Sequence, residues 1–218
     1  MTQMFEALRQ VADLGGPVVM VLIGVSILTL AVILYKLWQF RAAGAGRHRE
    51  LSDAVAAFDR GDRAGAEAAL SRSRSYLAPV IGMAFTAGPA DAARLEAEAE
   101  TRFARLESGF RLLDSVAQLA PLLGLFGTVL GMIEAFQSLQ QAGAQVDPSL
   151  LAGGIWVALL TTAVGLAVAM PTALVHSWFE ARMDAERVTA GRAISTVLFP
   201  QGATADTAAP FGAVPAGA

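Results

Sequence analysis

Two threonines are the residues whose type and position in this sequence could serve proton transfer. Thr128 lies 14 residues after Asp114. Thr162 lies 14 residues before His176, so two antiparallel helices would hold both hydroxyls about 21 Å from these markers. A hydroxyl can hydrogen-bond a proton carrier without being one, and a threonine in a helix often bonds its own backbone carbonyl. Their shared depth makes the pair a better pore candidate than either residue alone.

Each threonine belongs to a series of small residues that recurs at steps of three and four, which places the series on one helix face. The two series are Ala117, Pro121, Gly124, Thr128, Gly131 and Ala135, and Gly154, Ala158, Thr162, Gly165, Ala169 and Thr172 or Ala173. Small faces let helices in lipid approach closely. Two interpretations remain open: a packing seam within one chain, or a narrow surface facing a pore or a partner helix. One helix can contribute to both.

The elements that would hold these threonines are stretches without charge. The chain has 218 residues, 55% hydrophobic and 16% charged, and 22 of its 35 charged side chains lie between Arg41 and Asp114. Three stretches contain no Asp, Glu, Lys or Arg: Leu14–Tyr35, Ser115–Ile133 and Pro148–Phe179. Because a bilayer core needs about 20 mainly apolar residues per helix, they predict an all-α membrane protein with three transmembrane helices.

Basic residues are unevenly distributed around these spans. One precedes the first span, none lies in the loop between the second and third, and the other 15 lie in or beside the remaining segments. This asymmetry predicts an outer N-terminus and a cytoplasmic C-terminus. The predicted organisation is 1–40, N-terminus and first span, with the helix over Pro17–Phe40; 41–113, cytoplasmic helical domain; 114–136, second span; 137–149, outer loop; 150–178, third span; 179–199, cytoplasmic helix; and 200–218, disordered tail.

The cytoplasmic segment is predicted to be helical throughout. The pattern gives helices over Glu50–Arg60, Arg63–Ser73 and Leu77–Ala87. A further helix starts at Asp91, and no breaker is recognised before Pro121. We therefore expect one helix of about 66 Å from Asp91 to Glu134, and a third-span helix that continues through Glu180–Arg192.

Several classes of function are not supported by the composition. There are no cysteines, which excludes disulfides and thiol chemistry, and a net charge of −3 gives no basic footprint for nucleic acid. The sequence contains no Gly-rich phosphate loop and no Gly-x-Ser-x-Gly turn, so no motif in it indicates an enzyme. His48 is expected in an exposed linker and His176 at the membrane interface, and neither has the further ligands of a metal site. No cofactor is predicted.

The central part of every predicted span lacks an ionisable side chain. A proton that crosses hydrocarbon needs a titratable relay, which threonine hydroxyls do not supply. If this protein conducts protons, we expect another chain to provide the carboxylate.

The sequences around the two threonines resemble the ExbB/TolQ/MotA proton-channel family, in its ExbB/TolQ branch. The similar segments are Ala120–Ile133 (APLLGLFGTVLGMI), Gly154–Leu166 (GIWVALLTTAVGL) and Ala169–Pro171 (AMP), within about Asp114–Ala181. By motif position Thr128 and Thr162 match the pore threonines of that family.

The resemblance implies a pentameric ring around a central pore in the bacterial inner membrane, with a periplasmic N-terminus and a cytoplasmic C-terminus. It implies a single-span ExbD/TolR-like partner inside the pore, whose membrane-embedded Asp would supply the missing carboxylate. Protonation of that Asp by the proton-motive force would drive a TonB- or TolA-like envelope protein, for biopolymer transport or envelope maintenance.

One position departs from the family pattern. Many relatives carry Glu in Gly-Ile-x-Glu-Ala-Leu, where this sequence has Val157. Glu134 lies six residues outward of Thr128 and Val157 five outward of Thr162, so Glu134 could replace that carboxylate; an ordinary interfacial Glu is the alternative. For the whole chain, the alternatives are a non-conducting membrane scaffold or the same motor driven by Na⁺.

Overall fold

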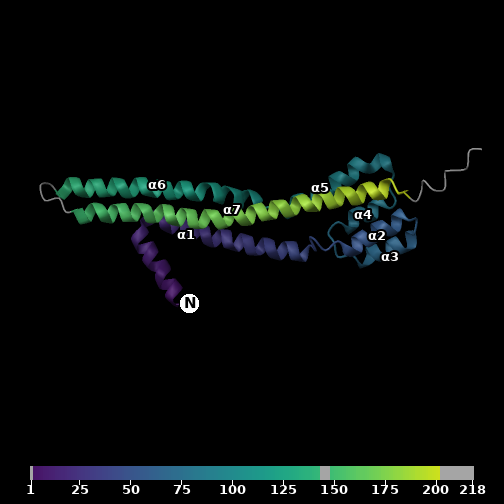
Figure 1. Ribbon diagram of the computed structural model, residues 1–218, viewed down its shortest axis with the longest axis horizontal. Coiled ribbons are helices and arrows are strands. Elements are labelled where there is room, and N and C mark those ends of the chain that lie inside the picture. The colour runs from purple at the N-terminus through teal and green to yellow at the C-terminus, as the bar shows by residue number, and fades with distance from the viewer. Residues whose placement is uncertain (1, 143–147, 202–218) are drawn as a thin grey trace, which may run out of the picture. The chain divides into compact units, whose positions relative to one another are not determined.

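The computed structural model describes residues 2–142 and 148–201, and every regular element within them is helical (Figure 1). The helices are α1 (Thr2–Ala42), α2 (Arg49–Asp59), α3 (Arg63–Arg72), α4 (Ala78–Ala84), α5 (Ala92–Glu107), α6 (Phe110–Ala142) and α7 (Pro148–Leu198), with a 3₁₀ turn η1 at Pro89–Asp91. Three segments are long and apolar enough to cross a membrane: Gly16–Ala42, Phe110–Gln141 and Leu151–Leu198. The prediction of an all-helical chain with three membrane-capable helices is confirmed.

The described residues form two compact units. Unit 1 comprises residues 2–36, 109–142 and 148–180, and unit 2 comprises residues 37–108 and 181–201. The prediction of a disordered tail from Pro200 onward concerns residues that lie, after Gln201, outside the described part of the chain.

The membrane-capable part of α1 begins directly after a kink. Gly16 has φ 64° and ψ −166°, a conformation that suits glycine, and it separates two helical segments within α1. Pro17 follows as the first residue of the second segment, where its missing N–H costs no helical hydrogen bond. The helix predicted over Pro17–Phe40 thus begins at Pro17, directly after the break at Gly16.

Unit 1 is built from α1, α6 and α7, and α6 lies alongside α7 (Figure 1). Leu22 of α1, Val116 and Ala120 of α6, and Ala169 of α7 form a buried apolar cluster. Most larger apolar side chains point outward instead; Leu122, for example, is 58% exposed. A small, tightly packed interior with a large apolar exterior suits a lipid environment, because apolar side chains need not be buried there.

An aromatic cluster occupies the end of unit 1 where α6 begins. The rings of Phe110 and Phe179 stack with centroids 5.4 Å apart, and the His176 ring meets Phe110 edge-on at 5.9 Å. The Lys36 ammonium lies 5.7 Å from the centre of the Phe110 ring and is buried. The His176 side chain is 12% exposed, and its Nδ1 lies 3.6 Å from Glu180 Oε2.

Unit 2 packs α2 to α5 with the end of α7. The apolar positions of its helices face inward, among them Leu51 of α2, Ile81 of α4, Phe103 of α5 and Ile194 of α7. Local capping marks the helix starts: the Asp62 carboxylate accepts the Gly65 N–H at 2.8 Å at the beginning of α3.

The expected unbroken helix from Asp91 to Glu134 is wrong. Helix α5 ends at Glu107, Ser108 is extended with ψ 126°, and Gly109 adopts φ +92° before α6 begins at Phe110. This left-handed conformation is open to glycine but strained for other residues, so Gly109 is the breaker that the sequence pattern did not reveal. Pro121, in contrast, lies inside α6 without ending it.

Helix α7 does continue beyond its apolar part, as predicted. It runs without interruption to Leu198. A bilayer core takes only about 20 residues of helix, so we treat its charge-free residues 151–179 as the membrane-spanning part and the charged residues from Glu180 onward as lying outside it.

Candidate functional site

The small faces of α6 and α7 meet each other within the chain. A methyl group on Gly165 would lie 2.6 Å from the Ala120 carbonyl oxygen and 3.1 Å from the Gly124 Cα. At the other end of the contact, a methyl group on Gly154 would clash with the Cβ of Ala135. The backbones are thus as close as glycine and alanine permit, which is the geometry of a packing seam. We call this contact the α6–α7 seam.

The structure places the residues of the predicted small face at different points of unit 1. Gly124 and Gly165 lie in the α6–α7 seam, and a methyl group on Gly131 would lie 3.4 Å from Ala158. The remaining two residues lie elsewhere: Ala169 is in the buried cluster with Leu22, and Pro121 is half-buried. For these glycines and Ala158, the contacts therefore agree with the first interpretation, a packing seam within one chain.

The two predicted threonines lie at the border of the seam. Thr162 is half-buried, and its Oγ1 lies 3.5 Å from the Gly124 carbonyl oxygen of the facing helix. Thr128 is also half-buried, and its Oγ1 donates to the Leu125 carbonyl of its own helix at 2.6 Å. Both residues thus keep part of their surface exposed at the edge of a helix pair.

Contacts across the seam fix the relative depth of the threonines. Gly124 approaches the Cα of Thr162, and Gly127 approaches the side chain of Thr161. Thr128 directly follows Gly127, so it lies within about one helical turn of Thr162 along the pair. The depth inferred from the residue count is consistent with this arrangement.

Sequence reasoning missed Thr161, the more deeply buried neighbour of Thr162. It is 2% exposed, and its Oγ1 donates to the Ala158 carbonyl at 2.7 Å, with the Gly124 carbonyl 3.1 Å away. A side-chain bond toward the facing backbone ties α7 to α6 as well as to itself. Gly124 and Gly127 lie three residues apart on α6 and both face Thr161. This pair of glycines is the sequence signal that could have indicated a close contact there.

Glu134 is exposed on α6, near the end of the seam that Ala135 and Gly154 form. It precedes Ala135, which contacts Gly154, whereas Val157 precedes Ala158, which contacts Gly131. The two positions are consequently within about one helical turn of each other on neighbouring helices.

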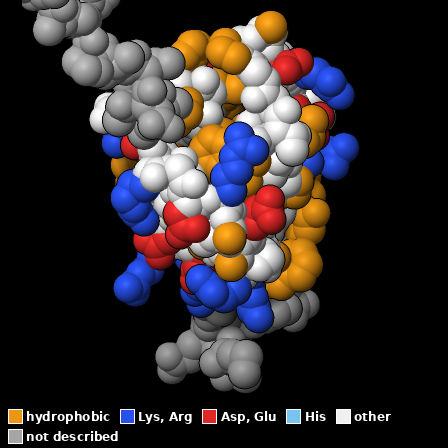
Figure 2. Space-filling view, turned by 90° about the vertical axis from the view of Figure 1, so that its right-hand side faces the viewer, with side chains coloured by type: hydrophobic (Ala, Val, Ile, Leu, Met, Phe, Trp, Pro, Cys, Tyr) orange, Lys and Arg blue, Asp and Glu red, His pale blue; other side chains and the backbone are white. Residues whose placement is uncertain are grey.

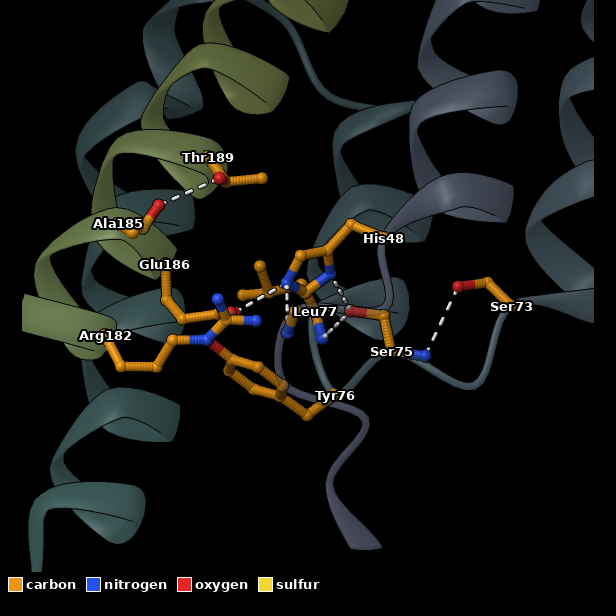
Figure 3. Close-up of polar contacts among 10 residues, drawn as sticks. His48, Ser73, Ser75, Tyr76, Leu77, Arg182, Ala185, Glu186 and Thr189 are labelled. Atoms are coloured by element: carbon orange, nitrogen blue, oxygen red, sulfur yellow. Dashed lines mark hydrogen bonds and ion pairs between the residues drawn. The ribbon is translucent and has the colours of Figure 1, made fainter. Parts of the chain in front are cut away.

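A second polar site lies inside unit 2 (Figure 3). His48 Nε2 lies 2.6 Å from Glu186 Oε2, and the Tyr76 hydroxyl donates to the same oxygen at 2.9 Å. When Nε2 donates to the carboxylate, Nδ1 accepts from the Ser75 hydroxyl, 2.9 Å away. The expectation of an exposed His48 is thus wrong, since its side chain is 13% exposed and its partner Glu186 comes from 138 residues further along the chain.

The electrostatics of this buried cluster favour an ionised Glu186. Burial opposes ionisation, but hydrogen bonds from His48 and Tyr76, with the nearby charge of Arg182, outweigh it and hold the pKa of Glu186 below its ordinary value. Burial, together with the adjacent Glu186 carboxylate, raises the pKa of Tyr76. Within the described residues, no group of three or more His, Cys, Asp or Glu side chains could hold a metal ion.

We predict that Glu186→Gln destabilises unit 2 and flattens its response to acid. A carboxylate whose folded pKa is lowered stabilises the fold above its unfolded pKa of about 4.3, and this contribution is lost as pH falls from there through the folded pKa. At pH 7 the loss of charged hydrogen bonds should cost about 2 kcal/mol, or roughly 4–8 °C in Tm. Thermal unfolding of the detergent-solubilised chain between pH 3 and 8 measures both effects.

The matched control is Glu96→Gln on α5, an exposed carboxylate whose removal should leave Tm within about 1 °C. Equal Tm values and equal acid slopes for the two variants would show that the cluster contributes nothing to stability.

Comparison with known proteins identifies relatives of the segment that contains the seam. Residues 88–190 match the MotA/TolQ/ExbB proton channel family. An ExbB-type biopolymer transport protein of Vibrio cholerae is 46% identical over 67 residues, which cover 31% of this chain and 29% of that protein. A putative ExbB homologue of Methanothermobacter thermautotrophicus is 35% identical over 132 residues, 57% of this chain and 46% of the relative.

A TolQ protein of the Tol-Pal system from Haemophilus influenzae is 39% identical over 80 residues, 37% of this chain and 35% of that protein. The aligned parts thus span less than half the length of each of these three relatives.

Three membrane-capable helices and a glycine seam between two of them define a multi-pass helical membrane protein. The resemblance of this chain to the MotA/TolQ/ExbB proton channel family, and within it to the ExbB/TolQ branch, is confirmed by the family match and by relatives named ExbB and TolQ.

Proposed function

We propose that this chain is the ring-forming subunit of a proton-driven motor in the bacterial inner membrane. One observation carries the proposal: Thr128 and Thr162 lie within about one turn of each other on two paired helices that carry no ionisable side chain in their central parts. Hydroxyls at one level can guide a proton carrier, but the carrier itself must come from a partner.

The partner that fits is a single-span, ExbD/TolR-like subunit with one Asp in its membrane helix. In this proposal a homo-oligomer of the chain, a pentamer as the resemblance implies, surrounds the partner helices and exposes their Asp to either side of the membrane in turn. The work is passed to a TonB- or TolA-like envelope protein. The N-terminus is periplasmic and the C-terminus cytoplasmic, in agreement with the distribution of Lys and Arg.

A non-conducting scaffold is the second candidate, and the packing of the small faces favours it. Gly124, Gly165 and Thr161 make their closest contacts within the chain, as they would in a purely structural bundle. Affinity purification of the full chain, followed by native mass spectrometry, separates the two functions. We expect a homo-oligomer that retains a single-span, Asp-bearing protein, whereas a monomer without such a partner would support the scaffold.

We predict that Glu134→Gln lowers the proton-driven activity about tenfold. An exposed carboxylate at the outer end of the seam would concentrate cations at the pathway entrance, and charged entrances raise the local ion concentration by roughly 10-fold or more. Activity should be measured at equal expression, and again with Na⁺ replaced by K⁺ at fixed pH. Glu134→Asp, which keeps the charge, should retain most of the activity. Unchanged activity in Glu134→Gln would reduce Glu134 to an ordinary interfacial residue.

A further inference from the structure

Unit 2 contains a basic cavity that the proposed motor does not use. Its volume is about 680 Å³. The charged lining side chains are Arg41, Arg47, Arg49, Arg72, Arg74 and Glu50. Five guanidinium groups against one carboxylate leave a large excess of positive charge around one concave surface. We call this cavity the arginine cavity.

Two segments that are separate in the sequence, residues 41–50 and 72–74, bring the arginines together. Arg41 comes from the last turn of α1, the next two from the loop before α2 and its first residue, and Arg72 and Arg74 from the end of α3 and the loop after it. The face seen in the space-filling view carries Lys and Arg side chains interspersed with Asp and Glu (Figure 2).

The loops that carry these arginines are held in place by the backbone. The Tyr76 N–H donates to the Ala43 carbonyl at 3.2 Å, which joins the two loops. Gly44 has φ +69°, and a methyl group there would lie 2.8 Å from the Arg74 carbonyl oxygen. Glycine is thus required for the approach of the two loops, and His48 fastens the same region to Ser75. The backbone that carries the arginines is thus held in place before any ligand binds, which lowers the entropy cost of binding.

The arginine cavity gathers charges that no ion pair within the described part of the chain neutralises. The ion pairs of the described residues involve Arg102, Arg182, Arg187, His48 and His176, and none includes an arginine of the cavity. Positive charges that are gathered in this way repel one another, and an anion relieves this repulsion. The guanidinium fork matches the oxygens of a phosphate group.

The position of the cavity in the sequence indicates the source of that phosphate. Arg41 is the penultimate residue of the first membrane-capable helix, which ends at Ala42. The charge-free stretch of α1 ends at Tyr35, so Arg41 lies about 9 Å further along the helix, close to the depth of phospholipid headgroups. We propose that the arginine cavity binds the phosphate headgroup of an anionic phospholipid and thereby fastens unit 2 to the membrane surface.

The test compares two short-chain lipids and inorganic phosphate on the purified full chain. Binding of dioctanoyl phosphatidylglycerol and dioctanoyl phosphatidylcholine is measured by native mass spectrometry and titration calorimetry. We expect at least tenfold tighter binding of phosphatidylglycerol. The triple variant Arg47→Gln, Arg49→Gln, Arg74→Gln should lose at least tenfold of this affinity.

The matched control removes three exposed arginines of the same unit that do not line the cavity. These are Arg60→Gln, Arg94→Gln and Arg105→Gln, which change the net charge equally. The control variant should bind phosphatidylglycerol like the wild type. If the Gln triple variant does not fold, the corresponding Lys variant keeps the charge and should still lose several-fold in affinity, because Lys lacks the guanidinium fork.

Three results would overturn the proposal. The first is equal binding of the two lipids by the wild type, and the second is equal loss in the cavity and control variants, which would indicate unspecific charge attraction. The third is displacement of phosphatidylglycerol by inorganic phosphate at equal concentration, which would assign the cavity to a soluble phosphate compound.

Discussion

Replacing Gly165 by valine is expected to prevent α6 and α7 from pairing and to destroy the folded protein. A Cβ at this position would lie 2.6 Å from the Ala120 carbonyl oxygen and 3.1 Å from the Gly124 Cα. Both are backbone atoms of the facing helix and cannot turn aside as a flexible side chain would, so the helices must separate along the α6–α7 seam. We expect a loss of about 3 kcal/mol or more, a 100-fold change in the folded ratio.

Gly153→Val is the matched control for this prediction. Gly153 belongs to the same helix and is exposed, and a methyl group at this position would meet no atom within 4 Å. The Gly153→Val protein should unfold near the wild-type temperature and elute as a single species in size-exclusion chromatography. Similar Tm values and yields for the two glycine variants would contradict the α6–α7 seam as the contact that holds unit 1 together.

The double variant Thr128→Val, Thr162→Val is expected to fold normally and to lose about 100-fold in proton-driven activity. Valine has nearly the shape of threonine but no hydroxyl, and both side chains lie at the border of the seam. If each hydroxyl gives one hydrogen bond to the charged partner carboxylate, each loss costs about 1.5 kcal/mol, or roughly tenfold in rate.

Two comparisons separate this effect from packing. Thr128→Ser with Thr162→Ser keeps both hydroxyls and should retain most of the activity. Thr161→Val instead removes the buried hydroxyl that faces Gly124, so it should lower Tm, with its effect on activity following that loss of stability. Full energised activity in the valine double variant would exclude the threonines from the proton pathway.

The three membrane-capable helices could be predicted because their lengths follow from stretches without charge. The same patterning failed at Ser108 and Gly109, where the helix between Asp91 and Glu134 breaks. An isolated glycine in an amphipathic run is compatible with a continuous helix. Only the three-dimensional surroundings of Gly109 determine that it adopts φ +92° and ends the helix. A larger residue would also meet a neighbour here, since a Cβ on Gly109 would lie 3.3 Å from the Lys36 Cε.

The small faces could also be predicted, but not what each would contact. Steps of three and four residues select one side of a helix, and Gly124 and Gly131 of one series and Gly165 of the other lie in the contact between α6 and α7. They do not say which neighbour the face meets, and Thr161 was passed over because its adjacent residue fitted the series better.

The polar cluster of unit 2 was outside the reach of sequence patterns. Its central pair, His48 and Glu186, is separated by 138 residues, and His48 stands between two arginines that suggest a solvated linker. Burial of such a pair depends on tertiary packing, for which neither composition nor periodicity gives information. The arginine cavity likewise joins two segments, residues 41–50 and 72–74, whose proximity follows only from the fold.

The central claim is that this chain supplies the channel and a partner supplies the proton carrier. Proton flux into liposomes, driven by a potassium diffusion potential and followed with an internal pH-sensitive dye, measures this directly. We predict no flux above empty liposomes with this chain alone, and clear flux when the single-span, Asp-bearing partner is reconstituted with it. Flux of equal size from the chain alone, or from the complex after the partner Asp is replaced by Asn, would contradict the claim.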